Sequence, residues 1–147
     1  IMLEDETKLN TKNNTEYIEK YKNHNSILFW ELGNEYNYHP EWFGGNIDNW
    51  YNQLETAAAN VKTIDPNHPV STGNGEVPSL DVINSCPSVD VWGMNIYRFL
   101  NTTSAITDLA SYSDKAMYIS ESGADSFNKV LMTEKFFVQN MIFCNFI

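Results

Sequence analysis

The chain has 147 residues, of which 42% are hydrophobic and 14% aromatic, and this suits one domain with a buried core. Its formal net charge is −10 and its pI is near 4.5, an acidic balance that argues against nucleic acid and against an anionic membrane surface as partners. No apolar run in the sequence reaches the roughly 18 residues that a membrane span requires.

Cysteine usage and targeting signals bear on the compartment. Cys86 and Cys144 form no CxxC pair and have no histidine at metal-ligand spacing, so the sequence predicts no metal site and leaves their disulfide state open. No signal peptide is visible, but the tripeptides that start at Asn13 and Asn101 fit the acceptor pattern for N-glycosylation. We expect an extracellular or periplasmic protein.

Predicted helices and strands alternate along the chain. The first 12 residues are polar and show no pattern. In chain order, the predicted elements are a helix over 15–23, a strand over 27–32, a loop over 36–46, a helix over 47–63, a strand over 70–72, a short helix over 79–85, a strand over 89–96, a helix over 105–112, a strand over 116–120 and a helix over 130–143.

Three local signals support the first of these elements. Asn13 and Asn14 are predicted to cap the first helix. The run from Ile27 to Leu32 is short, almost wholly apolar and bounded by polar turns, which is typical of a buried strand. Within 47–63 the apolar residues recur at helical spacing, so one face of that helix is expected to be buried.

This alternation favours an α/β fold with a parallel sheet and right-handed crossovers. The predicted strands are continuously apolar, as expected when both faces of a sheet are covered. The sequence shows no linker and no low-complexity tract.

Two glutamates lie just past the ends of predicted strands. Glu35 follows the first strand and Glu121 the last, with two further strands between them. In α/β folds this edge of the sheet carries the chemistry. Two carboxylates in one cleft favour a state in which one is protonated and the other ionised, and retaining glycoside hydrolysis needs such a pair about 5–5.5 Å apart. On position alone, either glutamate could instead face water or cap the next helix.

The surroundings of both glutamates resemble the clan A glycoside hydrolases. The segments are WELGNE at 30–35, DVWGMNIY at 90–97 and YISESG at 118–123. They are closest to family 2, the β-galactosidase and β-glucuronidase relatives, and to family 72, the β-1,3-glucanosyltransferases, and the sequence leaves that choice open. The resemblance implies a (β/α)8 TIM barrel.

The resemblance also implies roles for four residues. Glu35 would be the general acid/base and Glu121 the nucleophile that forms a covalent glycosyl-enzyme. Asn34 would hydrogen-bond the sugar 2-hydroxyl, and Tyr97 would hold Glu121 ionised and aimed. Glu31 competes for the acid role, but it lies four residues earlier, inside the barrel, so we expect it to be structural.

Aromatic residues in the predicted loops on the same side are expected to stack on sugar rings, since ring faces pack against sugar C–H patches. They are Trp42, Tyr36, Tyr38 and Phe99. Asn74 follows the second strand and is expected to line the cleft. Trp30 and Trp92 lie within strands and are expected in the core.

A complete barrel takes about 250 residues. Counted by the family pattern, residues 1–147 supply about strands 4 to 7 with flanking helices, an incomplete catalytic barrel whose parent protein is expected to be the active species. The predicted function is that of a retaining glycoside hydrolase acting on a β-linked oligo- or polysaccharide, without a cofactor. The alternatives are a β-glucan transglycosylase with the same residues and a non-catalytic carbohydrate-binding barrel. An α/β enzyme of other chemistry has no supporting motif.

Overall fold

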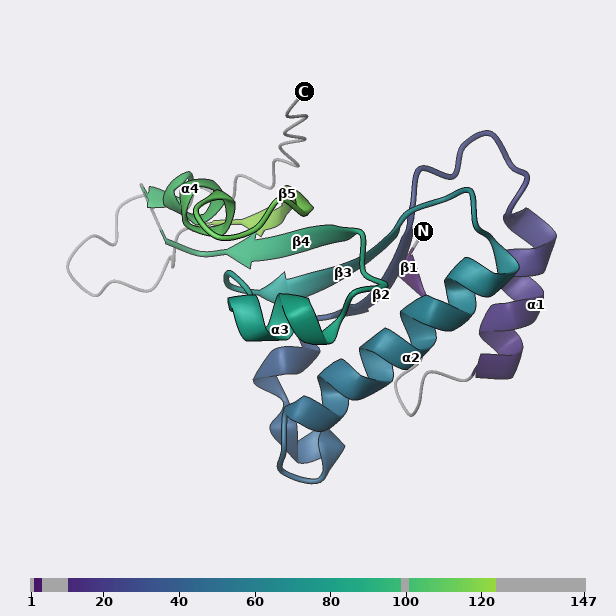
Figure 1. The fold of residues 1–147 in the computed structure, drawn as a ribbon, viewed down its shortest axis with the longest axis horizontal. Helices are drawn as coiled ribbons and strands as arrows, with labels where there is room; N and C mark the ends of the chain where they lie inside the picture. Colours follow the sequence, from purple (N-terminus) through teal and green to yellow (C-terminus); the bar gives the residue numbers. More distant parts are fainter. Residues whose placement is uncertain (1, 4–10, 99–100, 124–147) are drawn as a thin grey trace, which may run out of the picture.

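A computed structural model describes residues 2–3, 11–98 and 101–123, and within them five parallel strands form one sheet (Figure 1). The strands follow one another across the sheet in chain order. They are β1 (Met2–Leu3), β2 (Trp30–Asn34), β3 (Val70–Gly75), β4 (Val91–Ile96) and β5 (Ala116–Ser122). Because neighbouring strands are parallel, their carboxyl ends lie along one edge of the sheet.

Helices and short turns connect the strands. They are α1 (Thr11–Tyr21), the 3-10 turns η1 (Tyr36–Tyr38) and η2 (Pro40–Phe43), α2 (Asp48–Ile64), α3 (Leu80–Ser85) and α4 (Ser104–Ala110). The long helix α2 packs on β2 and β3, with α1 beside it (Figure 1). No helix in the described part of the chain is long and apolar enough to cross a membrane.

The core lies between the sheet and the helices. From β2, Trp30 and Leu32 contribute side chains that are 0% and 1% exposed. The apolar face predicted for the long helix is confirmed as buried: Trp50, Tyr51, Leu54, Ala57, Ala58 and Val61. Trp92 on β4 is also fully buried, so both strand tryptophans belong to the core as expected.

A buried polar contact ties the end of α2 to β2. Asp65 follows α2, and its carboxylate accepts a hydrogen bond from the Trp30 indole at 2.8 Å. It also contacts Nδ1 of His68 at 2.7 Å and accepts from the backbone N–H of Asn67 at 3.0 Å. Asp65 is fully buried, so these contacts stand in for the water it loses.

The expectation that the strands are apolar throughout is wrong for the sheet face away from α2. On that face, the Tyr118 hydroxyl donates a hydrogen bond to the Glu31 carboxylate and lies 3.2 Å from the Ser71 hydroxyl. Glu31 is 8% exposed and Ser71 is fully buried. This face therefore carries a polar network, whereas the opposite face packs against the helices.

Several predicted boundaries need correction. The first buried strand covers Trp30–Asn34 rather than 27–32, and the strand predicted over 70–72 extends to Gly75. The loop over 36–46 contains the two 3-10 turns. The first helix begins at Thr11, before the asparagines expected to cap it, because the cap preference of asparagine does not exclude it from a first turn. The helix predicted over 130–143 lies outside the described residues.

The stretch predicted to be without pattern contains β1. Its two residues pair in parallel with Glu31 and Leu32 of β2. A two-residue strand is too short to show hydrophobic periodicity, which explains why sequence reasoning did not find it. Within the described residues, the sheet therefore has one strand more than the four that were predicted.

Candidate active site

A bulge at Gly33 determines where the end of β2 directs its side chains. The register between β2 and β3 shifts between Glu31 and Asn34, and Gly33 has φ +70°. A side chain at Gly33 would lie 2.7 Å from the Trp50 ring of α2, so only glycine fits this backbone. The extra residue places Asn34 on the same face of the sheet as Glu31, although they are three residues apart.

Glu35 follows this bulge directly. Its backbone is in the left-handed region, with φ 55° and ψ 19°, and its N–H donates to the Gly73 carbonyl at 2.8 Å. Few non-glycine residues adopt this conformation, and those that do are concentrated at functional sites. Glu35 therefore lies at the carboxyl edge of the sheet, held to the neighbouring strand by its backbone.

Glu121 lies at the same edge, within the last residues of β5. A register shift between β4 and β5 places Ile119 opposite Met94 and Glu121 opposite Asn95. The Tyr97 hydroxyl donates a hydrogen bond of 2.7 Å to Oε2 of Glu121. The expected pairing of Tyr97 with Glu121 is thus present in the described geometry.

The ionisation of Tyr97 reflects both glutamates. The hydrogen bond to Glu121 raises the pKa of Tyr97 to about 12, and burial and the negative charges of Glu121 and Glu35 act in the same direction. Tyr97 therefore remains a hydrogen-bond donor at neutral pH. The charge of Glu35 acts on the same phenol that contacts Glu121.

Asparagine and serine side chains link the strand ends. Nδ2 of Asn95 donates to Oδ1 of Asn34 at 3.0 Å, and Oδ1 of Asn95 accepts from the Ser120 hydroxyl at 2.6 Å. A side chain at Gly73 would lie 2.8 Å from Oδ1 of Asn34. Asn34 is thereby fixed between β3 and β4, next to Glu35.

The loop after Glu35 presents aromatic side chains. Tyr36 is partly buried against Trp50 at a ring separation of 4.8 Å, and Trp42 is 59% exposed. The His39 ring stacks on Trp42 at 3.9 Å, so one face of that indole is already covered. Tyr38 is 53% exposed, and burial together with the charges of Glu76 and Glu35 raises its pKa. Phe99 lies outside the described residues.

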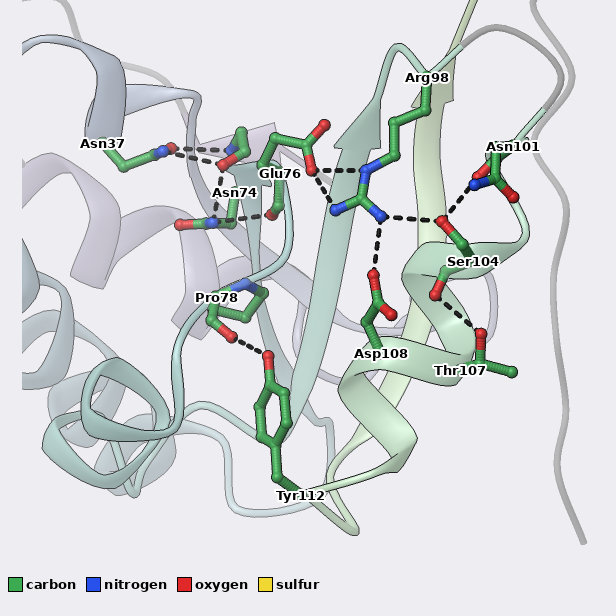
Figure 2. Close-up of polar contacts among 11 residues, drawn as sticks. Asn37, Asn74, Glu76, Pro78, Arg98, Asn101, Ser104, Thr107, Asp108 and Tyr112 are labelled. Carbon is green, nitrogen blue, oxygen red and sulfur yellow. Dashed lines mark hydrogen bonds and ion pairs between the residues drawn. The ribbon is translucent and has the colours of Figure 1, made fainter.

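The Asn74 side chain is buried, and Figure 2 shows its hydrogen bonds to the turn after β3. It is 3% exposed, accepts a hydrogen bond from the Tyr51 hydroxyl at 3.1 Å and donates to the carbonyls of Gly75 and Glu76. These contacts occupy the side chain, and they give Asn74 a structural part in the turn after β3.

The family of the chain follows from a comparison with known families. Residues 4–146 match the family described as "Glycosyl hydrolases family 2, TIM barrel domain". The chain belongs to family 2 of the glycosyl hydrolases. This match covers nearly the whole chain, and it favours family 2 over family 72. The predicted TIM barrel fold and the predicted membership of a glycoside hydrolase family are confirmed.

One curated relative of this family 2 chain is Mannan endo-1,4-beta-mannosidase F from Aspergillus clavatus. It is 39% identical over 56 residues. The match spans 38% of this chain and 12% of the relative. The five described parallel strands and their helices accordingly form part of a family 2 barrel.

Sequence reasoning missed three residues that organise this family 2 site. Asn95 joins Asn34 to Ser120, and its place in the segment DVWGMNIY was a signal that could have been used. Asn37 donates to the Gly75 carbonyl at 2.9 Å and accepts from the Gly75 N–H at 2.8 Å (Figure 2). Arg98 forms an ion pair with Glu76, and nothing in the spacing of the sequence indicates that contact.

Proposed function

We propose that the protein containing this chain is a retaining β-glycoside hydrolase that uses Glu35 as the acid/base and Glu121 as the nucleophile. The observation that carries the proposal is the 2.7 Å hydrogen bond from Tyr97 to Glu121 at the sheet edge that also bears Glu35. A carboxylate held by a phenol donor is oriented for attack on an anomeric carbon.

The proposed reaction has two steps. Glu121 attacks the anomeric carbon while Glu35 protonates the leaving oxygen, and a covalent glycosyl-enzyme forms. Glu35 then accepts a proton from water, which hydrolyses that ester and releases the sugar with its original configuration. Asn34, fixed by Asn95, donates to the sugar 2-hydroxyl.

The aromatic loop after Glu35 supplies the proposed sugar contacts. Trp42 is 59% exposed and its ring lies 5.6 Å from that of Tyr36. Both rings would stack on the substrate, and the exposed Tyr38 lies on the same loop. The substrate is a β-linked oligo- or polysaccharide. Because one relative is named for cleaving β-1,4-linked mannan, β-mannan belongs in the first screen beside β-glucans and aryl β-glycosides. An extracellular or periplasmic location fits such a substrate.

The decisive test replaces each glutamate in the full-length protein that contains this chain. Glu121→Ala should abolish turnover of an aryl β-glycoside, and added azide should restore it with inverted product, because the small anion takes the place of the missing nucleophile. Glu35→Ala should lose hydrolysis of the polysaccharide but keep a first step on substrates whose leaving group needs no proton.

Glu19→Ala is the matched control, because Glu19 is an exposed glutamate on α1 that pairs with Lys22. It should keep wild-type turnover. Undiminished activity in Glu121→Ala would contradict the proposal. Transfer of sugar to a saccharide acceptor in place of water would indicate the transglycosylase alternative, and sugar binding without any turnover would indicate the binding barrel.

A further inference from the structure

Arg98 immediately follows Tyr97 and holds the chain just beyond β4. Its Nε and Nη2 donate to Oε2 of Glu76 at 2.9 and 2.6 Å. Its Nη1 donates to the Ser104 hydroxyl at 2.9 Å and to Oδ2 of Asp108 at 2.8 Å. Figure 2 shows the guanidinium between Glu76 on one side and the two α4 residues on the other.

The partners of Arg98 are themselves fixed. Glu76 directly follows β3, adopts φ 63° and donates its backbone N–H to the Asn95 carbonyl at 3.1 Å. Ser104 and Asp108 lie on α4, the helix that follows β4. Arg98 thus connects the end of β3 with α4 through a fork of donors that lysine cannot reproduce.

The position of Tyr97 depends on the chain on both sides of it. It lies one residue beyond β4 and is 52% exposed, yet its hydroxyl must stay within hydrogen-bond distance of Glu121. Its ring does lie close to Gly123, where a side chain would be 3.0 Å away. On one side of Tyr97, Ile96 is fully buried and pairs with Ser122 of β5, and on the other side the charged contacts of Arg98 hold the chain.

We propose that Arg98 is a positioning residue: by joining the end of β4 to Glu76 and Asp108, it holds Tyr97 where its hydroxyl reaches Glu121. This inference rests on the proposed function. The charges involved are partly exposed, with side chains 30% exposed for Arg98, 41% for Glu76 and 52% for Asp108. Pairs of this kind contribute little to stability, so their loss should affect catalysis more than folding.

The test is a double-mutant cycle in the full-length protein, with kcat and KM measured on an aryl β-glycoside that the wild type cleaves. Arg98→Met should lower kcat about ten-fold and change KM less than about two-fold, because the reacting groups are misplaced while binding remains. In the Tyr97→Phe background, the same substitution should lower kcat less than about two-fold, because its target is gone.

Lys62→Met is the matched control. Lys62 forms an ion pair of 2.5 Å with Asp90. Asp90 directly precedes β4, so this pair lies at the end of the strand opposite to Tyr97 and Arg98. It should leave kcat unchanged. Equal losses from Arg98→Met in both backgrounds, or a loss no larger than that of Lys62→Met, would overturn the inference.

Two milder variants keep the inference testable should Arg98→Met not fold. Glu76→Gln and Asp108→Asn each remove one charge from the cluster and keep its shape. Each should lower kcat in the wild-type background and not in Tyr97→Phe, and additive losses would count against the inference. A wild type without glycosidase activity would contradict the proposed function, whereas an active wild type with additive losses would contradict only the role of Arg98.

Discussion

At the scale of single residues, the proposed chemistry depends on the hydrogen bond that the Tyr97 hydroxyl donates to Glu121. The Tyr97 pKa of about 12 keeps this hydroxyl protonated across the range in which enzymes normally work. A donor of this kind keeps a carboxylate charged and oriented.

Replacing Tyr97 with phenylalanine removes this donor and keeps the ring. We expect kcat/KM to fall about 10- to 100-fold, the usual effect of losing a hydrogen bond to a charged group. The basic limb of the pH–rate profile should not move, because Tyr97 loses its proton only near pH 12. Steady-state kinetics from pH 4 to 10 would measure both effects, and a loss smaller than two-fold would show that Glu121 does not need the phenol.

The alternation of elements predicted which residues lie at the strand ends, whereas the roles expected of them came from the resemblance to a known family. Glu35, Glu121 and Tyr97 lie at the edge that the alternation of elements indicates. Asn74 is also at a strand end, but its side chain points inward to Tyr51. Which face a side chain takes depends on bulges and register, and no local pattern in the sequence reports these.

At the scale of elements, the turn after β2 is fastened to the end of β3. Asn37 forms two hydrogen bonds with the backbone of Gly75, and the Tyr38 ring packs directly over Gly75. A side chain there would come within 2.1 Å of the Tyr38 ring. The aromatic loop that we propose to bind sugar therefore rests on a residue without a side chain.

Gly75→Ala should displace Tyr38 and loosen this loop. We expect a loss of about 1–3 kcal/mol in the free energy of unfolding, as for other overpacked sites, together with a higher KM. Tyr38→Ala in the same chain should recover most of the stability, because it opens the space that the methyl group needs. Denaturant unfolding of the single and double variants checks this, and equal instability in both would refute the packing argument.

At the scale of the whole molecule, the fold joins its sheet to its helices through a buried charge. Burial acts to raise the pKa of Asp65, but the hydrogen bonds from Trp30, His68 and the Asn67 backbone outweigh it and hold that pKa below its usual value. A lowered pKa means that the folded state binds this proton less readily than the unfolded state. The resulting stability is present above about pH 4 and is lost as the pH falls through the folded-state pKa.

Asp65→Asn should make this dependence visible. At pH 7 we expect the variant to lose about 1–3 kcal/mol, because the donors around Asp65 lose their charged acceptor. Below pH 4 the melting temperatures of wild type and variant should converge. The control is Asp114→Asn at an exposed aspartate, which should follow the wild type. A difference in melting temperature between wild type and Asp65→Asn that stays constant from pH 7 to pH 3 would contradict a lowered pKa of Asp65.

The overall architecture could be predicted further than its details. Alternating helices and strands indicate a parallel sheet, and the long helix shows its buried face in its spacing. Glu31 was expected inside the barrel, but its hydrogen-bond partners could not be foreseen, because Ser71 and Tyr118 come from two other strands. Burial of a carboxylate depends on partners that are distant in sequence.

The two successive side chains after β4 contact different neighbours. Tyr97 donates a hydrogen bond to Glu121 on β5, whereas Arg98 donates to Glu76 in the turn after β3 and to Asp108 on α4. Inserting or deleting one amino acid before these two residues is therefore expected to move the phenol away from Glu121 and the guanidinium away from Glu76. A change in the length of this junction would disturb both contacts at once, whereas a substitution at either residue removes one of them.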